Sequence, residues 1–93
     1  MKQVKQYECL GNTITVRRVT VDELPDDAVA CYDSETHEIL LLKTLSKDAM
    51  LHAFLHEHTH AALQALGRTE LNDDEVFVDT FAGLLHQMLK SCK

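Results

Sequence analysis

The pattern His-Glu-x-x-His at residues 56–60 constrains this chain more than any other feature of its sequence. Positions four apart on a helix share one face, so His56 and His60 would offer two imidazole nitrogens to one metal ion. Glu57 flanks the same site. Two imidazole ligands beside a carboxylate base for a metal-bound water are the arrangement of a zinc hydrolase. The alternative is a solvated helix face, because roughly 3% of shuffled chains of this composition would contain the pattern.

A third protein ligand is expected, because catalytic zinc usually takes three and keeps one position open. Four acidic residues near the start of the next helix are candidates: Asp73, Asp74, Glu75 and Asp79. Geometry favours Glu75, because the first helix continues about 9 Å past His60 before the connector reverses the chain. Glu75 then returns level with the histidine pair. Asp79, one turn further on the same face, is placed to accept a hydrogen bond from a ligand histidine.

Both of these acidic residues also have a purely structural interpretation. Glu75 could complete a capping box with Asn72 at the start of its helix, and one carboxylate cannot fill both roles at once. Asp79 could be an ordinary acid on the protein surface. The pattern of residues alone leaves these alternatives open.

The combined motif, His56-Glu57-x-x-His60 followed by Glu75-x-x-x-Asp79, resembles that of the gluzincin metallopeptidases. The segment from Glu75 onward is similar to the compact minigluzincin and ImmA/IrrE-like group, which is often found in phages and mobile elements. The resemblance covers roughly residues 32–90. It implies that His56, His60 and Glu75 bind Zn²⁺, that Glu57 is the general base and that Asp79 supports a ligand histidine. It also implies that residues 38–42 form the sheet edge along which an extended peptide pairs.

Three strands are predicted before the motif. Residues 12–21 combine Ile14 and Val16 with β-branched threonines, and a turn at Gly11-Asn12 precedes them. Residues 28–32 and 38–42 are expected to form a hairpin around a turn at residues 33–36. Residues 1–8 are polar and are expected to fray.

Two long helices are predicted after the strands. Ser46 is the expected N-cap of a helix over residues 47–66, and Gly67 supplies its left-handed end. Asn72 is the expected cap of a second helix that runs to about residue 90. The residues expected to face the core are Met50, Phe54, Leu55, Ala62 and Leu66 in the first helix, and Phe77, Phe81, Leu84, Leu85 and Met88 in the second.

The order of these elements predicts the fold class. Strands followed by helices are typical of an α+β protein. We expect residues 1–93 to form one zincin-like domain: a small antiparallel sheet of about three strands, with two long helices packed on one face.

Several other polar residues could lie near the motif. His52 is one turn before His56 and is expected at the rim of the site. His58 points away from the metal face and is expected to be a hydrogen-bonded histidine of the core or of an interface. His86 could line the cleft or have a structural role. Tyr32 and His37 are both candidates for polarising a substrate carbonyl.

Composition excludes several classes of protein. The net charge is −6, and the few Lys and Arg form no long patch, which argues against nucleic-acid binding. No apolar run approaches the length of a membrane span, and the first six residues lack the apolar core of a secretory signal. Three cysteines, Cys9, Cys31 and Cys92, form no Cys-x-x-Cys pair. They are expected to be reduced thiols in a cytoplasmic protein.

The resulting functional hypothesis is a zinc-dependent peptidase that acts on a protein or peptide substrate. A metal-activated water would attack the peptide carbonyl, with Glu57 as the general base. The alternative is a non-catalytic, peptidase-like module that keeps the zinc and regulates or inhibits a partner protein, such as a phage-encoded inhibitor. A Glu57→Gln variant separates the two hypotheses.

Overall fold

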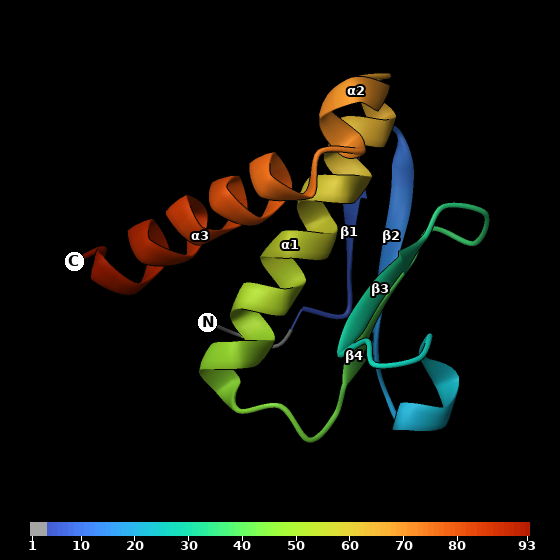
Figure 1. Ribbon diagram of the computed structural model, residues 1–93, viewed down its shortest axis with the longest axis vertical. Coiled ribbons are helices and arrows are strands. Elements are labelled where there is room, and N and C mark those ends of the chain that lie inside the picture. Colours follow the sequence, from blue (N-terminus) through green and yellow to red (C-terminus); the bar gives the residue numbers. More distant parts are fainter. Residues whose placement is uncertain (1–3) are drawn as a thin grey trace.

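A four-stranded mixed sheet followed by helices forms the structure, a computed structural model that describes residues 4–93 (Figure 1). The strands are β1 (Gln6–Cys9), β2 (Asn12–Val19), β3 (Ala30–Asp33) and β4 (Glu38–Leu42). They lie in the order β1-β2-β4-β3, and a short 3₁₀ turn, η1 (Val21–Glu23), follows β2. The predicted α+β class is confirmed.

The predicted three-stranded antiparallel sheet is wrong in two respects. The polar segment at residues 1–8 was expected to fray, but Gln6–Cys9 form β1, and residues 1–3 lie outside the described residues. Leu10 and Gly11 both have positive φ, of 47° and 87°, which suits the two-residue turn that joins β1 to β2. β2 and β4 are parallel, because the chain after β2 first forms the outer strand β3 and then returns as β4.

The position of β4 corrects a second prediction. Residues 38–42 were expected to form the peptide-binding edge, but β4 lies between β2 and β3. Ile39 is 0% and Leu41 is 3% exposed, as is typical of a strand with neighbours on both sides. The predicted hairpin of β3 and β4 is confirmed, and it leaves β3 as the outer strand.

Helix α1 (Lys47–Ala65) lies across the sheet and contacts β1, β3 and β4 (Figure 1). Its predicted ends are confirmed: Ser46 accepts a hydrogen bond from the Ala49 amide, and Gly67 has a φ of +71°. Ala61 packs with Ile14, Ile39 and Leu41 in the core, and Met50 and Phe54 pack against this cluster. Leu55 is also buried, whereas Ala62 is half-buried. Leu66 is exposed rather than buried, because it follows the last turn of α1.

Helix α3 (Glu75–Ser91) packs against α1, after a single helical turn, α2 (Thr69–Asn72). The expected cap is wrong: α2 already includes Asn72, and Asp74 instead accepts a hydrogen bond from the Phe77 amide at 3.1 Å. Figure 1 shows α3 crossing α1 obliquely, with its C-terminal end away from the sheet.

The predicted buried face of α3 is also wrong. Val78 and Ala82 are the buried residues of this helix, and both are 0% exposed. Phe77 and Leu85 are half-buried, whereas the other three predicted core residues are exposed: Phe81, Leu84 and Met88. α3 packs against α1 with the smaller residues Val78 and Ala82 buried, so its larger apolar side chains lie away from the buried face. Within residues 4–93, no helix has both the length and the apolar composition needed to cross a bilayer.

Candidate metal centre

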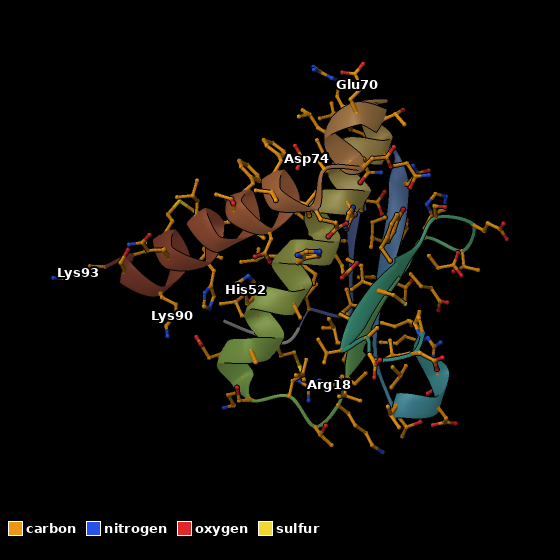
Figure 2. All side chains as sticks on the ribbon, in the orientation of Figure 1. Arg18, His52, Glu70, Asp74, Lys90 and Lys93 are labelled. Atoms are coloured by element: carbon orange, nitrogen blue, oxygen red, sulfur yellow. The ribbon has the colours of Figure 1, made fainter. Side chains whose placement is uncertain are left out.

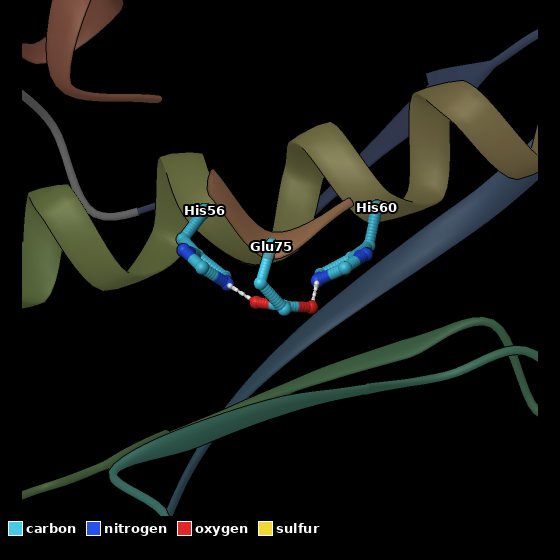
Figure 3. A group of neighbouring side chains, drawn as sticks. All are labelled: His56, His60 and Glu75. Atoms are coloured by element: carbon cyan, nitrogen blue, oxygen red, sulfur yellow. Dashed lines mark ion pairs between the residues drawn. The ribbon is translucent and has the colours of Figure 1, made fainter. Parts of the chain in front are cut away.

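Three predicted metal ligands converge between α1 and α3. His56 and His60 project from one face of α1, and Glu75 comes from the first turn of α3. Figure 3 shows the Glu75 carboxylate between the two imidazoles, with one oxygen directed at each ring. Glu75 Oε2 is 3.3 Å from His56 Nε2, and Glu75 Oε1 is 3.0 Å from His60 Nε2. One ligand atom from each residue lies within 4.8 Å of the others, so the group could hold a metal ion.

The second ring nitrogen of each histidine has its own acceptor. His56 Nδ1 is 3.2 Å from Asp79 Oδ1, the position predicted for Asp79. His60 Nδ1 donates to Asn72 Oδ1 at 2.6 Å. Sequence reasoning missed this role of Asn72, because it treated the residue as a helix cap. Hydrogen bonds at both Nδ1 atoms direct the Nε2 atoms toward Glu75, which is how ligand histidines are usually oriented.

The donor set fits zinc. With Nδ1 of His60 donating to Asn72 Oδ1, Nε2 is the ring nitrogen that faces the Glu75 carboxylate. When zinc is bound, that nitrogen and a carboxylate oxygen of Glu75 would both be ligands. Ligand atoms about 2.0–2.1 Å from a tetrahedral zinc are roughly 3.3 Å apart. Glu75 presents a different oxygen to each imidazole, at 3.3 and 3.0 Å, and one ligand atom from each of the three residues lies within 4.8 Å of the others, so the three ligand atoms would draw closer together around a zinc ion.

Glu57 lies beside this group and is almost inaccessible, with 9% of its surface exposed. Burial raises the pKa of its carboxyl, and the charges of His56 and His60 oppose that rise. A second carboxylate, Glu75, raises the pKa further. A carboxylate with a raised pKa is a stronger base than an ordinary surface carboxylate. The predicted base is therefore in a chemically suitable environment.

A cleft of about 440 Å³ opens in front of these residues. Ala30, Cys31 and Tyr32 of β3 form one wall, and His56, Glu57, His60, Asn72 and Glu75 line the other side. A second hollow of about 320 Å³ shares Ala30, His56 and Glu57 with the first. The two hollows therefore lie next to each other along β3, with Glu57 between them.

Cys31 lines the cleft, but its thiol is not suited to act as a nucleophile or a metal ligand there. Burial and the carboxylates of Glu57 and Asp33 raise the pKa of its thiol. The protonated thiol is a poor nucleophile and a poor metal ligand.

The other histidines lie outside the ligand group. His52 lines the second hollow with its Nε2 3.6 Å from Asp79 Oδ1, which agrees with the expected rim position. The predicted hydrogen bond of His58 is confirmed, because the Tyr7 hydroxyl lies 2.7 Å from its Nδ1. Burial lowers the pKa of His58, so the ring is neutral near pH 7. His86 lines neither hollow, and its Nε2 is 3.0 Å from Asp48 Oδ1, a structural contact.

Tyr32 and His37 contact each other through the Tyr32 hydroxyl and His37 Nδ1, at 3.2 Å. Tyr32 lines the cleft, whereas His37 is not among its lining residues. The role of either residue in polarising a substrate carbonyl stays a prediction.

Comparison of the chain with protein-family models, curated proteins and solved structures found no match. The resemblance to gluzincins therefore depends on the motif residues themselves.

Proposed function

We propose that this protein is a zinc-dependent peptidase of the gluzincin type. The observation that carries the proposal is the convergence of His56, His60 and Glu75 beside Glu57 in one cleft. The first three would hold the metal, and the fourth is a buried carboxyl in a position to act on a water molecule. Asp79 and Asn72 would keep the two imidazoles in the orientation that exposes Nε2.

The metal and Glu57 have different roles in the proposed reaction. Zinc, when bound, supplies a Lewis acid that activates water and stabilises negative charge on a carbonyl oxygen. A carboxylate oxygen of Glu57 accepts a proton from the attacking water. The same oxygen then passes the proton to the leaving amine as the peptide bond breaks. Burial supports both transfers, because it raises the pKa of Glu57 from that of an ordinary surface carboxylate.

The proposed substrate is an extended stretch of protein or peptide. β3 is the outer strand of the sheet and forms a wall of the cleft. An extended chain could pair with the free backbone groups of such a strand. The two adjoining hollows would receive its side chains on both sides of Glu57. The net charge of −6 does not favour a nucleic acid in this cleft.

We further propose a cytoplasmic location. Cys9, Cys31 and Cys92 are free thiols. Free cysteines are typical of proteins in a reducing compartment.

Glu57→Gln tests catalysis separately from zinc binding. The variant keeps the shape of the side chain but cannot accept a proton, so peptide cleavage should fall by roughly 100-fold or more with zinc affinity little changed. Zinc affinity is measured by competition with a chromogenic chelator, and cleavage with a mixed peptide library read by mass spectrometry. A wild-type protein that binds zinc tightly but cleaves nothing, with a biological effect that survives Glu57→Gln, would favour the regulatory module. Failure to bind zinc would contradict both.

A further inference from the structure

One face of α1 carries a titratable residue at every fourth position, and the candidate metal centre uses only part of this row. The row consists of Asp48, His52, His56 and His60. Residues four apart share a face of a helix, so His52 lies one turn before the ligand His56. Figure 2 shows His52 on the side of α1 that faces α3, and Lys90 on the side of α3 nearest the first turns of α1. The part of the row before His56 therefore also meets α3.

The Asp79 carboxylate joins His52 to the metal centre. One of its oxygens, Oδ1, lies 3.2 Å from Nδ1 of His56 and 3.6 Å from Nε2 of His52. The two imidazoles thus approach the same oxygen from successive turns of α1. The contact between His52 and the carboxylate is attractive when Nε2 of His52 carries a proton.

Asp79 needs this second contact because its side chain is 66% exposed, whereas that of His56 is 21% exposed. Water competes for an exposed carboxylate, and the side chain can turn to other rotamers, so a single contact with His56 would hold it loosely. A second contact on the same oxygen limits that freedom. His52 provides it from the helix that carries His56, and is placed to keep Asp79 where it accepts from His56.

The ring of His52 is itself held by α3. The ring of His86 lies beside it, with centroids 5.1 Å apart and planes 33° apart. The side chain of His86 is 16% exposed, and its Nε2 is 3.0 Å from Asp48 Oδ1. Nζ of Lys90 contacts the same oxygen at 2.8 Å and holds the pKa of the Asp48 carboxyl below its ordinary value. A continuous series of contacts therefore runs from Lys90 through Asp48, His86 and His52 to Asp79.

We propose that His52 is a positioning residue of the metal centre: it holds the Asp79 carboxylate against Nδ1 of His56 and so keeps Nε2 of His56 directed at the metal. Asp79 orients the ligand, and His52 orients Asp79. Loss of His52 should therefore weaken zinc binding less than loss of Asp79, for which roughly 10–100-fold is typical. The inference rests on the zinc binding of the proposed function, but not on peptide cleavage.

A double-variant cycle on zinc affinity tests this role. His52→Ala should weaken zinc binding by roughly threefold to tenfold, and Asp79→Ala should weaken it more. Because His52 acts through Asp79, adding His52→Ala to Asp79→Ala should cause no further loss. Asn72→Ala is the matched background: Asn72 orients His60, so His52→Ala should keep its full effect there. Competition with a chromogenic chelator measures all of these affinities.

The conservative variant His52→Gln separates a positioning role from a merely structural one. The amide nitrogen of glutamine can take the place of Nε2, so His52→Gln should restore most of the zinc affinity that His52→Ala loses. The His52 side chain is 40% exposed, and both alanine and glutamine are good helix formers, so both variants should fold. Urea unfolding of the metal-free proteins checks this.

Wild-type zinc affinity in His52→Ala would overturn the proposal. So would an equal loss of affinity on adding His52→Ala to the Asp79→Ala and Asn72→Ala backgrounds. A protein that binds no zinc would overturn this proposal and the proposed function together. A protein that binds zinc but cleaves no peptide would contradict only the peptidase, and the cycle would still decide the role of His52.

Discussion

Asn72 Oδ1 lies 2.6 Å from Nδ1 of His60, so a residue of the connector sets the orientation of a candidate metal ligand. The single turn α2 carries Asn72 back toward α1 just before Glu75 enters the site. Asp79 has the corresponding contact with His56 from the other side, at 3.2 Å. The two imidazoles are thus held by one neutral and one charged acceptor, and both direct Nε2 toward Glu75.

Asn72→Ala should weaken zinc binding by roughly tenfold or more, because His60 loses the acceptor that fixes its tautomer. Asp73→Ala is the control, since Asp73 is the exposed next residue in the chain. Competition with a chromogenic chelator measures both affinities. Equal affinities for the two variants would contradict the proposed role of Asn72.

Removal of zinc should lower the melting temperature. Zinc at about 1,000 times its Kd stabilises the folded state by about 4 kcal/mol, which corresponds to more than about 10 °C for a domain of this size. Calorimetry with and without a strong chelator measures the shift. His56→Ala should melt at the same temperature in both conditions. If the melting temperature of the wild-type protein does not change after confirmed removal of the metal, the result would argue against a ligated site.

Tyr7→Phe should destabilise the protein by about 1–2 kcal/mol, because His58 Nδ1 loses the Tyr7 hydroxyl, 2.7 Å away, and is left without a partner in the interior. This hydrogen bond ties β1 to α1. Urea unfolding gives the free energy of unfolding. Glu8→Gln, at the exposed neighbouring position of β1, should have little effect. Similar losses for both variants would show that the hydrogen bond contributes nothing specific.

The buried imidazole of His58 predicts a dependence of stability on pH. Its pKa is lowered from the ordinary 6.5 by burial, so the unfolded chain binds the proton more readily than the folded protein. The contribution of His58 to stability is complete above pH 6.5 and decreases as pH falls below it. Titration of the ring by NMR should give a pKa under 6.5. A value at or above 6.5 would contradict the neutral, buried assignment.

The part of the site that lies on α1 was predicted well from short sequence patterns. Ser46, Gly67 and the spacing of His56 and His60 are properties of a single helix, so the sequence alone was enough to predict the ends of α1 and the shared face of the two histidines. Glu75 was predicted as the third ligand from the number of residues between His60 and the start of the next helix, where the chain reverses. The structure brings it to the histidines as expected.

Contacts between distant segments account for what sequence reasoning missed. β1 is polar, and its pairing depends on Tyr7 lying opposite Ile14 and beside His58, fifty-one residues away. The rotation of α3 also could not be read from its apolar pattern. The first turn of α3 brings the Glu75 carboxylate to both Nε2 atoms, and Val78 and Ala82 are the residues of this helix that become fully buried. Its larger side chains Phe81, Leu84 and Met88 stay exposed.

Glu75→Gln tests the third ligand directly. Glutamine keeps the length of the side chain but removes the negative charge that matches zinc, so affinity should fall greatly with little loss of stability in the metal-free protein. A capping role for Glu75 with Asn72 is already excluded, because Asp74 caps α3. Asp74→Asn is the matched control: asparagine is an equally good N-cap, so zinc affinity and helix stability should be unchanged. If Glu75→Gln binds zinc like the wild type while Asp74→Asn binds it poorly, the ligand assignment is wrong and the gluzincin interpretation weakens with it.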